Sequence, residues 1–434
     1  MRRVFGLIIL FFLAGCNSTK TPQQIHGHHI DRIENHLIAP DYAKAVPVEH
    51  ASIADRLAYW KVPGVSIAII ENGNVVYSKG FGVANVETGA KVDEHTLFHG
   101  ASLSKPVNAT AAMKLVQEHR LELDTDINTQ LTAWKLEKNK FTEARPITLR
   151  RLLSHTAGMS MPFMGKGWPT TKPIPTIVDI LSGRPPATQP ATRPVHVEEI
   201  PGRRFHYSGG AVTISQLMIE EATGKPYSTY ITKNIFEPLG MSETTFDQTL
   251  SDEKLKHAAP GYKAGARVNG PENVYPAMAA AGIWTTAFEY CNLVIELRNA
   301  AMGKPAKILS QGAAETMMVP YVANEKNASG LAATVGMGLF LYGQANQPSH
   351  IFYHAGSHAG YSCYMVGQLE TGHGAVVMTN GEDAFDLIAE IIQTIGTEYG
   401  WPDYHFIPPP RAKDKLTTRP TSQSTDNPVK IPAI

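Results

Sequence analysis

The stretch Ser102-Leu103-Ser104-Lys105 decides how the rest of this sequence is interpreted. If a helix begins at Ser102, a lysine three residues further on lies one turn away on the same face. This geometry brings an amine within reach of a hydroxyl, which catalysis by a serine nucleophile requires. Pro106 is tolerated in a first helical turn. An apolar stripe then follows at Val107, Ala111 and Leu115. We therefore predict a helix that starts at Ser102 and carries a serine with a lysine partner.

The same spacing occurs a second time, at Ser251-Asp252-Glu253-Lys254. That copy lies in a charged run, which is typical of a solvated surface. The spacing alone is therefore not specific, and a catalytic interpretation of Ser102 needs partners elsewhere in the chain.

Three further stretches are candidates for these partners. Tyr207-Ser208-Gly209-Gly210 follows a Pro-Gly turn. His354-Ala355-Gly356-Ser357 follows the strand-like run Ile351-Phe352-Tyr353. Between Lys105 and Tyr207 lies the third stretch, Leu152-Leu153-Ser154-His155-Thr156-Ala157-Gly158-Met159. Together with Ser102 to Lys105, these motifs resemble the serine β-lactamase and penicillin-binding-protein superfamily, in particular its class C-like branch. The resemblance covers roughly residues 62–400 and includes Gly282 to Thr286.

The resemblance implies a role for each matching residue. Ser102 would attack a carbonyl, and Lys105 and Tyr207 would remove its proton and return it to the leaving group. Which of the two is the base stays open, because they can titrate as a coupled pair. The backbone N–H groups of Ser102 and Ser357 would bind the oxyanion. Gly356 would let the substrate approach the strand backbone.

Two positions depart from the class C pattern. Gly209 stands where that pattern has an asparagine that contacts the substrate's amide side chain. His354 stands where it has a lysine that helps to bind a substrate carboxylate. The resulting His-x-Gly is similar to D-aminopeptidases and esterases. We expect His354 to bind a polar group or carboxylate of the substrate, with a structural hydrogen bond to a loop carbonyl as the alternative. We expect His155 to buttress the cleft.

The N-terminus resembles a bacterial lipoprotein signal. Met1-Arg2-Arg3 is charged, and Val4 to Leu13 is apolar but too short to span a bilayer. Leu13-Ala14-Gly15-Cys16 resembles a cleavage box, so we predict a signal peptide over residues 1–15 and a lipid on Cys16, with an ordinary secretory signal as the alternative. The expected location is the cell envelope, at the outer membrane or periplasmic side in a Gram-negative cell.

Composition excludes several classes of protein. Lys and Arg together number 39, as do Asp and Glu, and no basic stripe is visible, which argues against nucleic-acid binding. No Gly-x-Ser-x-Gly pentapeptide occurs, which argues against an α/β-hydrolase. His26, His28, His29 and His36 fit a polar tether better than a metal site, and we expect neither metal nor cofactor. Cys291 and Cys363 lie in apolar segments and are expected to be buried free thiols.

Hydrophobic periodicity places strands at both ends of a largely helical region. Residues 65–70 and 75–81 predict a hairpin through Asn72-Gly73. Further strands are expected at 339–342, 349–353, 361–369 and 375–379, followed by a helix over 383–399. This order predicts an α+β fold, in which an antiparallel sheet is flanked by helices and interrupted by an inserted, mainly helical region.

The domain boundaries follow from this order. A tether over 16–47 precedes a β-lactamase-like domain over 48–400. Its sheet part comprises 48–105 and 331–400, and its helical part comprises 106–330. A Pro-rich loop is expected over 161–201, and an extended tail over 401–434.

These features predict a lipid-anchored serine hydrolase that forms an acyl-enzyme on small-molecule esters or amides. The alternatives are a cell-wall D,D-peptidase or D-aminopeptidase acting on D-peptides, a class C-like β-lactamase, and a noncatalytic envelope binding protein.

Overall fold

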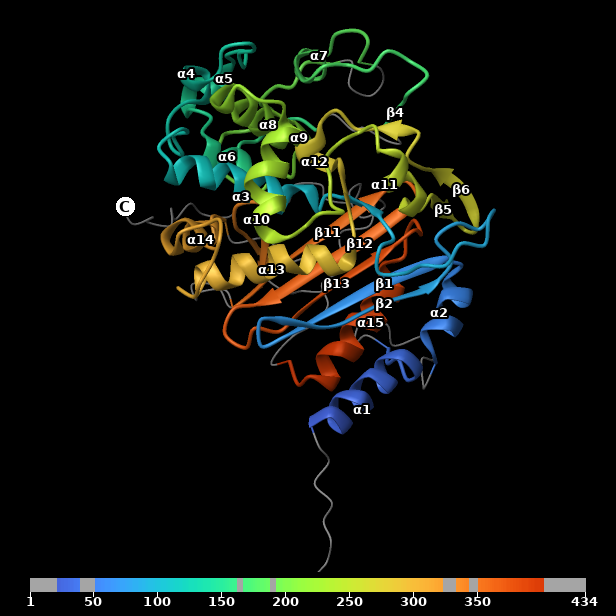
Figure 1. Cartoon of the computed structure of the whole chain (residues 1–434). Coiled ribbons are helices and arrows are strands. Elements are labelled where there is room, and N and C mark those ends of the chain that lie inside the picture. The colour runs from blue at the N-terminus through green and yellow to red at the C-terminus, as the bar shows by residue number, and fades with distance from the viewer. Residues whose placement is uncertain are drawn as a thin grey trace, which may run out of the picture.

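The computed structural model describes residues 22–39, 51–161, 167–187, 193–322, 333–342 and 350–401. Its centre is a seven-stranded sheet in the order β2-β1-β13-β12-β11-β10-β9 (Figure 1). The strands are β1 Gly64–Glu71, β2 Asn74–Gly82, β9 Ala333–Val335, β10 Phe340–Tyr342, β11 Ile351–His358, β12 Tyr361–Gln368 and β13 Gly374–Thr379. Every neighbouring pair is antiparallel. The α+β prediction is therefore confirmed.

The sheet joins the two ends of the domain. The N-terminal hairpin turns at Asn72 and Gly73, both with positive φ, as the Asn-Gly signal predicts. Its strand β1 then pairs with β13, with Val65 opposite Thr379. Every residue of β12 and β13 is buried, because helices cover both faces of the sheet.

Three helices lie on one side of the sheet, namely α1 Pro22–Asn35, α2 Ile53–Trp60 and α15 Phe385–Glu398 (Figure 1). The long helix α13, Ala287–Ala301, lies against the opposite face, below the helical part. None of the helices in the described ranges is both long enough and apolar enough to cross a bilayer.

The helical part is built from short helices around α3 and α8. Its helices are α3 Ser104–Gln117, α4 Ile127–Gln130, α5 Lys140–Ala144, α6 Leu149–Leu153, α7 Ile177–Ser182, α8 Gly209–Thr223, α9 Tyr227–Ile231, the π-helical turn η1 Thr232–Phe236, α10 Glu237–Leu239, α11 Asp252–His257, α12 Met278–Ala281 and α14 Gln311–Met317. Two-stranded pairs are formed by β3 Phe98–Ala101 with β8 Ile283–Thr285, β4 Trp168–Pro169 with β7 Asn273–Val274, and β5 Gly261–Lys263 with β6 Ala266–Asn269. The stretch expected to be a loop, 161–201, thus contains α7 and β4.

The segment expected to be a tether contains a docked helix, which corrects that prediction. Ile33 and Leu37 are fully buried in the core beside α15. The Glu34 carboxylate accepts hydrogen bonds from the Tyr77 hydroxyl at 2.8 Å and from the Lys79 ammonium at 2.7 Å, both on β2. The polar composition of the segment concealed these few apolar anchors, although Ile30, Ile33 and Leu37 have helical spacing.

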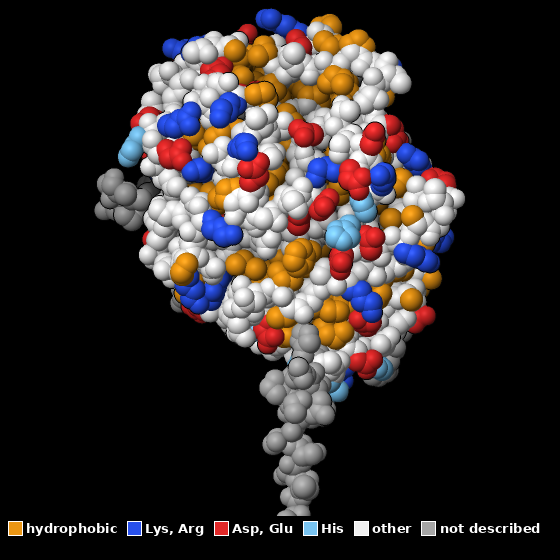
Figure 2. All heavy atoms as spheres, viewed as in Figure 1, with side chains coloured by type: hydrophobic (Ala, Val, Ile, Leu, Met, Phe, Trp, Pro, Cys, Tyr) orange, Lys and Arg blue, Asp and Glu red, His pale blue; other side chains and the backbone are white. Residues whose placement is uncertain are grey.

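The structure tests the predictions made for the two remaining cysteines and for the surface charge. Cys291 and Cys363 are free and buried, as expected, and burial raises the pKa of the Cys363 thiol to about 12. Cys16 and the tail beyond Trp401 lie outside the described residues. On the face shown in Figure 2, acidic and basic side chains are interspersed, with no basic stripe.

Candidate active site

Ser102 lies in a tight turn between β3 and α3. The helix begins at Ser104 rather than at Ser102, because the turn is closed by short-range bonds from Leu103 N to Gly100 O and from Lys105 N to Ser102 O, both 3.0 Å. Ala101 has a φ of 47°, a conformation that costs about 1–2 kcal/mol outside glycine. Strain of this kind is concentrated at functional sites.

Ser104 holds this turn in place, a role that no sequence pattern predicted. Its hydroxyl donates to Ala101 O at 2.7 Å and accepts from Ile283 N, on β8, at 3.0 Å. The turn is therefore fixed to the neighbouring strand as well as to the helix.

Lys105 reaches Ser102 as the spacing predicts. Its Nζ lies 3.0 Å from Ser102 Oγ and donates to Ala280 O at 2.6 Å. The side chain is only 4% exposed. One amine is thus held between the serine and a backbone carbonyl from α12.

Tyr207 meets the same serine from another element. It immediately precedes Ser208, the N-cap of α8, and its hydroxyl lies 2.9 Å from Ser102 Oγ. Lys105 Nζ lies 4.9 Å from the centre of the Tyr207 ring. Either partner is therefore positioned to exchange a proton with Ser102.

His155 buttresses Tyr207. The two ring centres are 4.4 Å apart, and His155 Nδ1 accepts a hydrogen bond from Ser208 N at 3.2 Å. The neutral ring therefore carries its hydrogen on Nε2. Burial, followed by the nearby charge of Lys105, holds the pKa of His155 well below its usual value. The ring fixes Tyr207 without adding a charge.

His354 is less accessible than we expected. The side chain is 1% exposed, and its Nδ1 bonds to the carbonyl of Ala355 at 2.8 Å. Burial, with a smaller contribution from Lys105, lowers the pKa of His354 to about 3. The ring is therefore neutral at pH 7 and offers no charge to a substrate carboxylate.

Gly356 is needed for packing, and a substrate's approach to its backbone stays a prediction. A Cβ at this position would lie 2.3 Å from Gly100 O, in the strand that leads to Ser102. The glycine thus lets β3 cross closely over β11.

Ser357, one residue further on, is exposed and lies beyond Ile351–Tyr353, the part of β11 that β10 covers. Its role as an oxyanion donor remains a prediction. So does any substrate contact by Gly209, which is buried at the start of α8.

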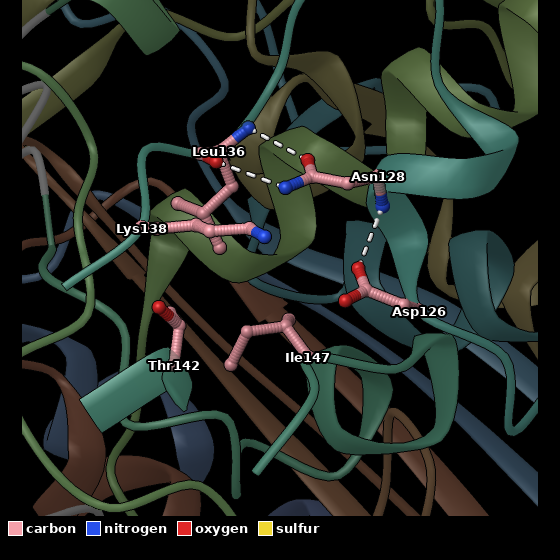
Figure 3. A pocket seen from close by; sticks show the side chains of 6 residues that line it. All are labelled: Asp126, Asn128, Leu136, Lys138, Thr142 and Ile147. Atoms are coloured by element: carbon pink, nitrogen blue, oxygen red, sulfur yellow. Dashed lines mark hydrogen bonds between the residues drawn. The ribbon is translucent and has the colours of Figure 1, made fainter. Parts of the chain in front are cut away.

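A hollow elsewhere on the molecule contains none of these residues. Figure 3 shows its lining side chains, which are Asp126, Asn128, Leu136, Lys138, Thr142 and Ile147. The Asn128 amide is occupied by both backbone groups of Leu136, and Asp126 accepts from Asn128 N at 2.9 Å. These bonds shape the α4 region, and we assign the hollow no chemistry.

The fold is that of the serine β-lactamase and penicillin-binding-protein superfamily. Residues 52–395 match the family described as Beta-lactamase. This match spans most of the chain, which therefore belongs to the β-lactamase family, a family of serine hydrolases.

The individual proteins that this chain resembles share only a modest fraction of its sequence. Protein flp of Staphylococcus aureus (strain N315) is 27% identical over 344 residues, which are 78% of this chain and 63% of that protein. The chain thus spans less than two thirds of the length of this relative. A solved structure of the octameric penicillin-binding protein homologue from Pyrococcus abyssi matches with a TM-score of 0.64 and 27% identity, covering 80% of this chain and 76% of that one. EstCE1, a hydrolase with promiscuous acyltransferase activity, has a TM-score of 0.62 at 19% identity, covering 79% of this chain and 96% of that one, which shows a shared fold.

Proposed function

We propose that this chain is a serine hydrolase that forms an acyl-enzyme on Ser102. The observation that carries the proposal is that Ser102 Oγ lies 3.0 Å from Lys105 Nζ and 2.9 Å from the Tyr207 hydroxyl. A hydroxyl becomes a useful nucleophile when a positioned base takes its proton. Both candidate bases are within hydrogen-bond reach.

The proposed reaction has two halves. Ser102 Oγ attacks the substrate carbonyl carbon while its proton passes to the Lys105 and Tyr207 pair. The tetrahedral intermediate then collapses, the bond to the leaving oxygen breaks, and the same pair returns the proton to that oxygen. Water repeats the sequence on the acyl-enzyme and releases the acid. Lys105 and Tyr207 act as one proton relay in this scheme.

We propose esters as the substrates. His354 is neutral and bonds to its own strand, so it supplies no charge for a carboxylate. Gly209 supplies no side-chain amide. An ester needs neither group, whereas each missing hydrogen bond to a charged or amide-bearing substrate costs about 1–3 kcal/mol of recognition. D-peptides and β-lactams are therefore expected to be poorer substrates.

Active-site labelling tests the proposal directly. A fluorophosphonate probe should modify Ser102, as mass spectrometry of the labelled peptide would show, and Ser102→Ala should remain unlabelled. Turnover of p-nitrophenyl butyrate should exceed that of a chromogenic cephalosporin and of a D-alanyl-D-alanine peptide. Label on another serine would refute the nucleophile assignment, and faster cephalosporin turnover would replace esterase with β-lactamase.

We also propose that Cys16 carries the lipid of a bacterial lipoprotein and anchors the chain in the cell envelope. The support is the Leu-Ala-Gly-Cys box that follows a short apolar run. In bacteria fed an alkyne fatty acid, the wild type should incorporate the label and Cys16→Ser should not. Equal incorporation by both would show that the lipid is elsewhere, and none in the wild type would contradict the anchor.

A further inference from the structure

Three aromatic rings from two segments of the chain meet beside the candidate nucleophile. Phe205 and Tyr207 come from the segment before α8, and Phe340 comes from β10. The ring centre of Phe340 lies 5.9 Å from that of Phe205 and 6.5 Å from that of Tyr207, and Phe205 and Tyr207 are 6.3 Å apart. All three side chains are half-buried, so part of each ring remains accessible. We call this group the aromatic wall.

Phe340 bridges the two sides of the site. Besides Tyr207, its ring contacts His354 on β11, with centres 5.1 Å apart. Its other neighbour, Tyr353, is a buried core residue whose ring stacks on Phe340 at 5.5 Å. Phe340 is therefore backed by the sheet, and the rings of Phe205 and Tyr207 pack against it.

Several polar and charged side chains near the wall already have partners. Lys105 is bonded to Ser102 and Ala280, and His354 is neutral. Arg204, close in sequence to Phe205, is paired with Glu199. His206 also faces acidic partners, Glu198 and Glu199, at 3.5 and 3.3 Å. A carboxylate placed against the wall would therefore have to compete with the present partners of Lys105 and Arg204.

The position of Tyr207 shows which part of a substrate would meet the wall. Tyr207 belongs to the proton relay, and the leaving oxygen must lie within hydrogen-bond distance of the group that protonates it. The atoms attached to that oxygen then extend beside the Tyr207 ring, where Phe205 and Phe340 lie.

We propose that the aromatic wall binds the leaving group of the substrate, and that this leaving group is a neutral, apolar alcohol. The inference rests on the proposed acyl-enzyme reaction and adds the substrate class of one subsite. Phe205 and Phe340 are specificity-determining residues in this proposal, because they contact the alcohol portion and not the reacting atoms.

Two ester series separate this subsite from the acyl side. One series keeps the acetyl group and lengthens the alcohol from methyl to hexyl, and the other keeps ethanol and lengthens the acid. Acid release in a pH-stat gives kcat/KM for each ester. In the wild type we expect kcat/KM to rise about fourfold per methylene of the alcohol over the first carbons, as apolar burial predicts. Phe340→Ala should flatten this rise and leave the acyl series unchanged.

Matched variants guard against a general loss of structure. Phe288, on α13, is 44% exposed, and Phe288→Ala should reproduce both wild-type series. Phe340→Leu retains an apolar side chain and should keep part of the alcohol dependence. Fluorophosphonate labelling of Ser102 in each variant reports an intact site.

The results distinguish this inference from the proposal on which it rests. If Ser102→Ala retains ester turnover, the acyl-enzyme proposal fails. If turnover requires Ser102 but Phe340→Ala keeps the wild-type alcohol dependence, or flattens the acyl series instead, the aromatic wall does not bind the alcohol.

Discussion

The chain contains the Ser-x-x-Lys spacing twice, and the two copies have different structures. In the first, Lys105 is 4% exposed and its Nζ contacts the Ser102 hydroxyl at 3.0 Å. In the second, Ser251 caps α11 by accepting from Lys254 N at 3.4 Å, and the Lys254 ammonium donates to the carbonyls of Ser242 and Glu243 at 2.9 and 2.6 Å.

The two lysines differ in the groups that surround them outside their own helices. Lys105 is enclosed by Tyr207, by Ala280 and by neutral histidines, so its amine has few partners other than the serine. Lys254 lies near the surface, and its ammonium group donates to two backbone carbonyls instead of to Ser251. The spacing therefore only permits the pairing, and the surroundings decide whether a serine and a lysine meet.

Substituting the two serines in turn should give the largest difference in activity between the two copies. We expect Ser102→Ala to lower kcat/KM for p-nitrophenyl butyrate by about 10⁴-fold or more, because loss of a nucleophile removes the covalent route. Ser251→Ala should change kcat/KM by less than about twofold, since its side chain caps a surface helix. Similar losses in the two variants would mean that the site has been misplaced.

Removing the lysines should give the next largest contrast. Lys105→Ala deletes a member of the proton relay, and we expect kcat to fall by about 10²–10⁴-fold. Lys254→Ala should leave kcat unchanged. Circular dichroism of both proteins checks that they are folded, and a fully active Lys105→Ala would exclude this residue from proton transfer.

A change of one atom tests Tyr207. Tyr207→Phe keeps the ring that packs on His155 but removes the hydroxyl, so kcat should fall by about 10²-fold or more while the melting temperature stays within a few degrees. Tyr321→Phe offers a control away from Ser102, because that hydroxyl bonds to Arg150 and Thr316. Full activity of Tyr207→Phe would leave Lys105 as the sole base.

Acid should destabilise the fold through the buried side chain of His354. The folded pKa of His354 is lowered to about 3 from a usual value of 6.5. Between these values the unfolded chain binds more protons than the folded one. The free energy of unfolding therefore falls as the pH drops from about 6.5, by at most about 1.4 kcal/mol per pH unit for one histidine. Urea unfolding at pH 7.5 and pH 5 should show a smaller difference for His354→Gln, and no change for exposed His95→Gln. Equal slopes in all three proteins would contradict the neutral, buried state of His354.

The smallest effect should come from the second serine's own function. Ser251→Ala removes the N-cap of α11, and caps of this kind contribute about 1 kcal/mol. We expect urea unfolding to report a loss of that size, whereas Ser251→Asp, which can still cap, should retain most of the stability. If Ser251→Ala loses more stability than this and Ser251→Asp loses as much, the hydroxyl has a partner other than the helix N-terminus.

Much of the fold could be predicted because its signals are local. The Asn72-Gly73 turn fixes the first hairpin, and Gly224 ends α8 in the left-handed conformation that glycine favours. The pattern Thr286-Ala287-Phe288-Glu289 is typical of a capping box, and Thr286 does cap α13, but the Glu289 carboxylate makes no return bond to the cap backbone. The Glu289 carboxylate accepts from Thr244 N at 2.7 Å instead, a partner that is remote in the sequence.

The candidate site was predicted as a set of residues, and its geometry was not. The sequence contained no signal for the start of α3 at Ser104 or for the contact of Gly356 with Gly100. Nor could it show that Phe340 lies against Tyr207. Each depends on how a strand, a helix and a distant segment pack together.

The sequence by itself determined the family of this protein, because four motifs in a fixed order carry their chemistry in residue types and short spacings. Only the tertiary structure decided which Ser-x-x-Lys copy has its two side chains in contact. It brings Tyr207 and Ala280 to Ser102 and Lys105 across separations of 105 and 175 residues. Local spacing places a side chain on a helix, but long-range packing sets its burial and its partners, and these two properties separate the candidate nucleophile Ser102 from the helix cap Ser251.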